Sequence, residues 1–77
     1  MNNMEIKEFI EKLAEAIEIE EVDNLTAETE FRNLDEWSSL SVMLLIAFFD
    51  EDLEKQIGDT EIKKCKTIGD LYYLAME

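Results

Sequence analysis

The sequence predicts a small all-α domain, and three observations support that prediction. The chain has no proline and only two glycines, which is too few turn residues for a β-rich fold of 77 residues. Its apolar residues recur at three- and four-residue intervals, as one face of a helix requires. The hydrophobic share of 47% is enough to form a packed core, and the length predicts a single domain over residues 1–77.

The first predicted helix covers roughly residues 4–17. Glutamates and two lysines occupy one side of it, and Asn2 and Asn3 are candidate caps for its start. The apolar residues lie three and four apart and therefore form a single stripe, which predicts an amphipathic helix packed on the core. This stripe consists of Ile6, Phe9, Ile10, Leu13, Ala14 and Ile17.

Residues 19–35 fit no single helical or strand period, and turn formers such as Asp23 and Asn24 lie among them. The segment predicts a long loop held to the core by its apolar side chains. A structureless loop of this length is unusual in a compact domain, so it needs either a short helical turn or a functional reason. The function predicted for this loop is to position the chain so that Ser39, at the start of the next helix, is presented at the surface. The apolar anchors are Ile19, Val22, Leu25, Phe31 and Leu34.

The central helix is predicted from Ser39 to about Glu54. A serine pair before a long apolar run indicates a helix start, and either Ser38 or Ser39 can cap it. The acidic end that includes Asp50 and Glu51 is either a recognition feature or a solvated helix end. Val42 and Leu44 are expected on the side opposite the core. The residues expected to face the core are Leu40, Met43, Leu45, Ile46, Phe49 and Leu53.

Two shorter helices complete the predicted fold. Gly58 is expected to end the central helix as a C-cap or loop residue, and Asp59 to cap a short helix through about Lys64. Thr67 and Asp70 have the spacing of a capping box, which predicts a last helix over 68–76. The side chains expected to face inward are Ile62, Cys65, Leu71, Leu74, Ala75 and one of the two tyrosines.

Composition restricts the function. A net charge of −13 argues against nucleic acid and anionic membranes as partners and favours basic protein surfaces. Because the chain has one cysteine and no histidine, it lacks a histidine or thiolate zinc site and a Ser-His-Asp or Cys-His catalytic group. The lone Cys65 fits a reducing, cytoplasmic location and is expected to be a small buried side chain. The longest apolar run, residues 42–49, is too short to insert across a bilayer.

The order of these elements resembles the acyl carrier protein family, which includes peptidyl and D-alanyl carriers. The resemblance extends from about Ile6 to Met76. The family's attachment motif is Asp-Ser-Leu, and this chain has Ser38, Ser39 and Leu40 in its place. Residues 31–37 resemble the segment that precedes this motif in the family. Residues 50–53 resemble the acidic end of the family's second helix. Residues 57–59 and 67–71 resemble the region of its third and fourth helices.

The resemblance implies a four-helix bundle of the acyl carrier protein type, with a long loop between helices 1 and 2 and a short third helix. Ser39 would carry 4′-phosphopantetheine, delivered from coenzyme A by a phosphopantetheinyl transferase. The arm would hold an acyl or aminoacyl group as a thioester, and the protein would be a monomer without enzymatic activity. Its partners would be acyl-loading and acyl-transferring enzymes, such as an adenylating enzyme, a ketosynthase or an acyltransferase.

The expected partner-binding residues surround Ser39 and continue along the central helix, although for Trp37 the preferred role is that of a loop anchor packed on the core. Ser38 departs from the family, whose Asp at this position helps the transferase to recognise its target. The cargo stays open between fatty acid, polyketide, amino acid (as in nonribosomal peptide synthesis) and D-alanine. An unmodified interaction module of the same fold is the alternative function. The partner-binding set is Trp37, Ser38, Leu40, Val42, Leu44, Asp50 and Glu51.

Overall fold

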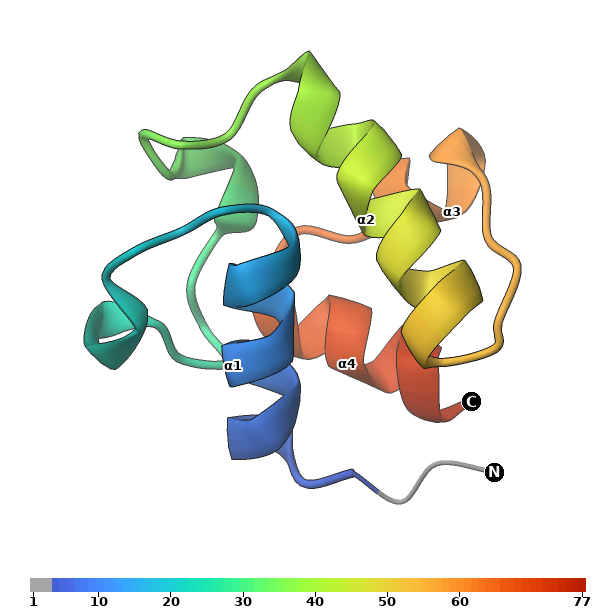
Figure 1. Ribbon diagram of the computed structural model, residues 1–77, viewed down its shortest axis with the longest axis horizontal. Helices are drawn as coiled ribbons and strands as arrows, with labels where there is room; N and C mark the ends of the chain where they lie inside the picture. The colour runs from blue at the N-terminus through green and yellow to red at the C-terminus, as the bar shows by residue number, and fades with distance from the viewer. Residues whose placement is uncertain (1–3) are drawn as a thin grey trace.

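The computed structural model describes residues 4–77 as an all-helical domain, which confirms the predicted fold class for this part of the chain (Figure 1). The candidate caps Asn2 and Asn3 lie outside the described residues. Over 4–77 no strand forms, and a single isolated bridge joins Glu30 and Thr67. The elements are α1 (Ile6–Ala16), the 3₁₀ turns η1 (Val22–Asn24) and η2 (Phe31–Asn33), α2 (Ser39–Asp52), α3 (Asp59–Lys63) and α4 (Ile68–Met76).

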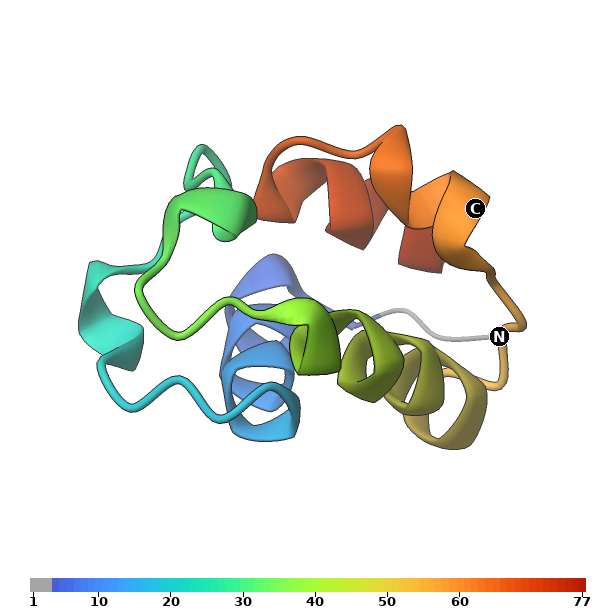
Figure 2. The same cartoon turned by 90° about the horizontal axis from the view of Figure 1, so that it is seen from above.

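The core lies between α1 and α2 on one side and α3 and α4 on the other, as Figure 2 shows. Phe9 of α1 is fully buried, and its ring lies 6.0 Å from that of Phe48 and 5.4 Å from that of Tyr72, centroid to centroid. The predicted α1 stripe is buried from Phe9 to Ile17, with Ile6 half-buried. Of the two tyrosines, Tyr72 packs on the core and Tyr73 is exposed.

The segment between α1 and α2 is anchored in the way its apolar residues predict. Ile19, Leu25 and Phe31 are buried, and Val22 and Leu34 are half-buried against the core. The short helical turns that a loop of this length requires are η1 and η2.

This loop also holds the start of α4. The carbonyls of Thr29 and Ala27 accept hydrogen bonds from the backbone N–H groups of Ile68 (2.9 Å) and Gly69 (2.8 Å). A Cβ at position 69 would lie only 3.0 Å from the Ala27 oxygen, so any larger residue would push the loop backbone back by a few tenths of an ångström. Two of the otherwise unpaired N–H groups of α4 are thus satisfied by the loop.

The connection between α2 and α3 differs from the prediction. Gly58 has an extended backbone and is the N-cap of α3, so the cap position is one residue earlier than the predicted Asp59. The Gly58 N–H donates to Glu61 Oε1 at 2.9 Å. α2 instead ends at Asp52, with Leu53 as C-cap and Glu54 in the left-handed region at a φ of 53°. The predicted helix end near Glu54 is therefore correct to within two residues, but the left-handed turn that follows α2 is at Glu54 and not at Gly58.

Glu54→Gly is expected to stabilise the fold by about 0.5–1 kcal/mol. A left-handed backbone costs a residue with a side chain roughly 1–2 kcal/mol, and glycine avoids this cost. Glycine also loses more conformational entropy on folding, which cancels about 0.5–1 kcal/mol of that gain. Urea unfolding of both proteins measures the difference. Glu51→Gly, inside α2, removes the same charge and is expected to destabilise by about 1 kcal/mol. Equal effects of the two substitutions would contradict the left-handed turn.

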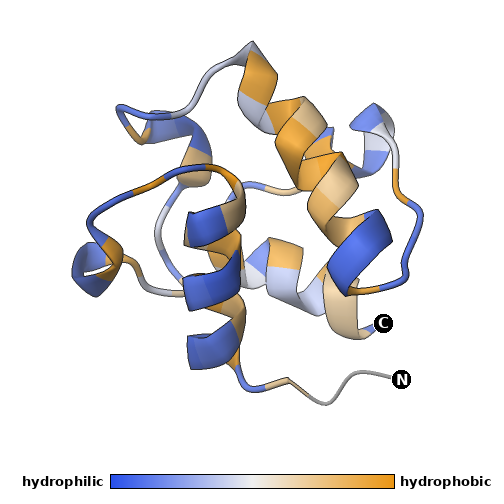
Figure 3. Cartoon of the chain, viewed as in Figure 1, coloured by the Kyte–Doolittle hydropathy of each residue, from blue (hydrophilic) through white to orange (hydrophobic). Residues whose placement is uncertain are grey.

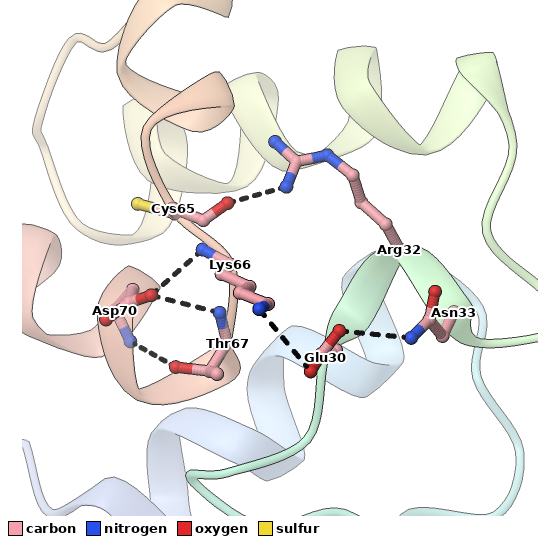
Figure 4. Close-up of polar contacts among 7 residues, drawn as sticks. All are labelled: Glu30, Arg32, Asn33, Cys65, Lys66, Thr67 and Asp70. Carbon is pink, nitrogen blue, oxygen red and sulfur yellow. Dashed lines mark hydrogen bonds and ion pairs between the residues drawn. The ribbon is translucent and has the colours of Figure 1, made fainter.

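The predicted capping box at the start of α4 is present (Figure 4). Asp70 Oδ2 accepts from the backbone N–H groups of Lys66 (2.9 Å) and Thr67 (3.1 Å), and the Asp70 N–H donates to Thr67 Oγ1 at 3.1 Å. The bonds from Lys66 and Thr67 favour the ionised carboxylate and lower the pKa of Asp70 below its ordinary 3.8.

Asp70→Asn is expected to lower the melting temperature at pH 7 and to have no effect well below pH 3. Because the pKa is lower in the folded protein, the ionised carboxylate stabilises the fold above pH 3.8, and this contribution is lost as pH falls through the folded-state pKa. Thermal unfolding at both pH values measures the change. Glu20→Gln, at an exposed site, matches the change in charge and should lack the loss at pH 7. A deficit of Asp70→Asn that persists undiminished at low pH would contradict this explanation.

Candidate functional site

Ser39 is the first residue of α2, and its neighbours provide the helix cap. Ser38 is the N-cap, with an extended backbone, and its N–H donates to Ser41 Oγ at 3.0 Å. The Ser41 N–H returns a bond to the Ser38 carbonyl, also at 3.0 Å, and the Ser41 side chain is buried. Of the two candidate caps in the sequence, the structure therefore selects Ser38.

The side chain of Ser39 is exposed, and within residues 4–77 no group forms a hydrogen bond with its Oγ. The hydroxyl lies at the electropositive end of a helix of 14 residues, whose first turn contains no acidic residue. An anionic group bonded to this oxygen would gain from the exposed N–H groups of the first turn. The hydroxyl is thus accessible, has no hydrogen-bond partner among residues 4–77, and lies in a field that favours a phosphate.

Trp37 anchors the segment that leads to Ser39. Its ring packs edge-on against the fully buried Phe31, with 5.0 Å between the ring centroids, and the Trp37 backbone N–H donates to the Leu34 carbonyl at 3.0 Å. The side chain is half-buried, so part of it stays accessible beside Ser38 and Ser39.

The rotation of α2 differs from the prediction. Leu40 and Met43, expected in the core, are 55% and 66% exposed. Val42 and Leu44, expected on the opposite side, are half-buried against the core. Leu45, Phe49 and Leu53 are buried as predicted, Ile46 is half-buried, and Phe48 is buried in addition.

The wrong prediction of which side of α2 faces the core has a physical cause. α2 is apolar on nearly all sides, as Figure 3 shows, so its periodicity does not define a single buried face. Ser41 looks like a surface residue but is turned inward, where it bonds to the Ser38 N–H and approaches the Glu36 carbonyl at 3.5 Å. The buried face of α2 is the one that carries Phe48 and Phe49, which pack against Phe9, and Ser41 lies on this same face.

One side of α2 is consequently exposed along its length, and its residues are spaced three and four apart. We call this the exposed α2 face; it consists of Leu40, Met43, Ala47, Asp50 and Glu51. It combines apolar side chains near Ser39 with carboxylates at the far end.

A groove of about 540 Å³ runs beside the exposed α2 face, between the helix and the segment that leads to α3. Apolar side chains and one carboxylate line it, which makes it an accessible surface for a partner with both apolar and polar groups. The lining residues are Met43, Ile46, Ala47, Asp50, Gln56 and Ile57.

Sequence reasoning missed Arg32, which joins the loop to α3. Its Nη1 donates to the Cys65 carbonyl at 2.6 Å and its Nη2 to the Ile62 carbonyl at 2.7 Å, and the first of these bonds is drawn in Figure 4. Arg32 is the only arginine in the sequence, and a fork of donors suits two neighbouring carbonyls. Its being the only arginine was the one feature of the sequence that could have marked Arg32 as a structural residue, but it could not identify the carbonyls to which Arg32 bonds.

Cys65 is buried, which agrees with its prediction as a small core side chain. Burial raises the pKa of its thiol, with the Asp70 carboxylate adding to the effect, so the thiolate is disfavoured. Among residues 4–77, no three acidic or thiol side chains are placed to hold a metal ion. The same part of the chain contains no helix with the length and apolar character needed to cross a membrane.

Comparisons with models of known protein families, with curated proteins and with solved structures each found no match. A function for this chain is therefore inferred from its fold and from the side chains around Ser39.

Proposed function

We propose that this chain is a carrier protein with the four-helix bundle of the acyl carrier family. Ser39 carries 4′-phosphopantetheine, and the terminal thiol of that arm holds an acyl or aminoacyl group as a thioester. A phosphopantetheinyl transferase attaches the arm: the Ser39 oxygen loses its proton and bonds to the pyrophosphate phosphorus of coenzyme A that bears the pantetheine. The pyrophosphate P–O bond breaks, and adenosine 3′,5′-bisphosphate leaves with its electron pair. The protein supplies the attachment point and the docking surface and performs no catalysis itself.

The observation that supports this proposal most strongly is the state of the Ser39 hydroxyl. It is exposed, has no hydrogen-bond partner in the described chain, and lies at the start of a long helix. A hydroxyl needed only for capping would be engaged with the first-turn N–H groups. Here Ser38 and Ser41 provide the cap, which leaves Ser39 available for covalent attachment.

The exposed α2 face is the proposed docking surface for the transferase and for the loading and transferring enzymes. Leu40 and Met43 offer apolar contacts close to Ser39, and Asp50 and Glu51 add negative charge further along. With a net charge of −13, the chain would be steered toward basic partner surfaces. Val42 and Leu44, half-buried, contribute less of this surface than the sequence alone suggested.

A second candidate function is an unmodified interaction module, and the exposure of Leu40 and Met43 favours it. Monomeric proteins seldom leave large apolar side chains grouped on one helix face without a partner. The groove beside them would accept apolar side chains of such a partner. In this function the Ser39 hydroxyl would stay free.

Intact mass distinguishes the two functions. The wild-type chain, incubated with coenzyme A and a broad-specificity phosphopantetheinyl transferase, is expected to gain the mass of one phosphopantetheine. A chain that stays unmodified both with this enzyme and with the transferases of its own source would support the interaction module instead.

A further inference from the structure

We infer that Arg32 is a positioning residue for Ser39, because it fixes the segment that leads into α2 against the end of α3. We call residues 31–38 the approach segment. The inference rests on the proposed function of Ser39 and adds to it the element that presents the serine to the transferase.

The contact between Arg32 and α3 uses both terminal nitrogens of the guanidinium. The acceptors are the carbonyls of Ile62 and Cys65, at 2.7 and 2.6 Å. Ile62 lies in the last turn of α3 and Cys65 directly follows the C-cap Lys64, so the guanidinium meets the chain where α3 ends. A single side chain thus joins two parts of the chain about thirty residues apart.

A series of packed groups connects this contact to Ser39. The Arg32 guanidinium carbon lies 4.8 Å from the centroid of the Phe31 ring, which is fully buried. The Phe31 ring packs against Trp37, which directly precedes the N-cap Ser38. The Trp37 ring and the Ser38 backbone are therefore placed relative to α3 through residues 31 and 32.

Few other polar contacts hold the approach segment in place. In the described chain, the side-chain hydrogen bonds that join residues 31–38 to α3 or α4 all come from Arg32. Loss of the guanidinium would let the segment populate other conformations, and only a fraction of molecules would then present Ser39 correctly. A transferase that binds only the competent conformation would show a higher KM with little change in kcat.

Hydrogen exchange tests the positioning directly and without the transferase. In Arg32→Ala, the amides of Trp37 and Ser41 are expected to exchange about tenfold faster than in wild type, because local opening of the segment becomes easier. The Leu71 amide in α4 is the internal reference and should keep its rate. Tyr72→Phe is the matched control, since it removes a hydrogen bond to the Met4 carbonyl in another part of the fold.

Kinetics of phosphopantetheine transfer then separate positioning from stability. Arg32→Ala is expected to raise the KM for the carrier about tenfold and leave kcat within about twofold. The KM of Arg32→Lys should lie between those of wild type and Arg32→Ala, because one ammonium group cannot reproduce a guanidinium that reaches two carbonyls. Tyr72→Phe should match wild type in both constants.

The outcomes separate this inference from the proposed function. Normal exchange and normal KM in Arg32→Ala, with Ser39 still modified, would overturn the role of Arg32 and leave the carrier function standing. Faster exchange at Leu71 as well would show general destabilisation and also overturn it. A wild-type chain that is never modified would overturn the carrier function and the kinetic role of Arg32 with it, while exchange would still decide whether Arg32 holds the segment.

Discussion

Ser39→Ala is expected to abolish attachment of phosphopantetheine completely. Alanine has no oxygen to bond to phosphorus, and we expect neither neighbouring serine to replace it. Ser38 is outside the helix as its N-cap, and Ser41 is buried and bonded to the Ser38 N–H. Intact mass after incubation with coenzyme A and a broad-specificity transferase should show only the unmodified chain.

Two serine variants are the controls for this result. Ser41→Ala removes the oxygen that accepts from the Ser38 N–H and is expected to cost about 1 kcal/mol of stability, whereas Ser38→Ala keeps the backbone groups that form the cap and should cost less. Both variants should still gain one phosphopantetheine. Ser39→Ala, an exposed change, should stay within about 0.5 kcal/mol of wild type in urea unfolding. Modification that survives in Ser39→Ala and vanishes in Ser38→Ala would place the arm on Ser38 and contradict the assignment.

Features that depend on neighbouring residues could be predicted from the sequence. The capping box of Thr67 and Asp70 needs only the three-residue spacing of a hydroxyl and a carboxylate. The anchors of the long loop could be identified because apolar residues that lie among polar turn formers are stabilised mainly by packing on the core. The α1 stripe was predictable because its opposite face is strongly charged, which leaves one buried side.

Features that depend on distant contacts could not be predicted. Arg32 bonds to carbonyls about thirty residues away, and no local pattern reveals them. The reciprocal bond between Ser38 and Ser41 is a capping box in which serine replaces the usual glutamate or glutamine at the third position, so its spacing was visible but its chemistry was not. The rotation of α2 depends on the packing of Phe48 and Phe49 against Phe9 of α1, and periodicity alone wrongly placed Leu40 and Met43 in the core.

Phe48→Ala is expected to destabilise the domain by about 3–5 kcal/mol. Phe48 is only 4% exposed, and its ring lies 6.0 Å from that of Phe9 and 5.9 Å from that of Phe49, so truncation would leave a cavity in the aromatic core. A chain of 77 residues has a total stability of roughly 4–12 kcal/mol, so this loss would leave much of the protein unfolded at 37 °C if the wild type lies near the lower end. Urea unfolding followed by circular dichroism measures it.

Met43→Ala is the matched variant, because it truncates a large apolar side chain of the same helix on the exposed side. At 66% exposure its loss should change stability by no more than about 0.5 kcal/mol. Periodicity alone placed Met43 inside, so the comparison of the two variants tests the rotation of α2. A large cost for Met43→Ala with a small one for Phe48→Ala would show that α2 is rotated the other way. The side chains proposed for docking beside Ser39 would then be buried, and the exposed α2 face could not be a partner surface.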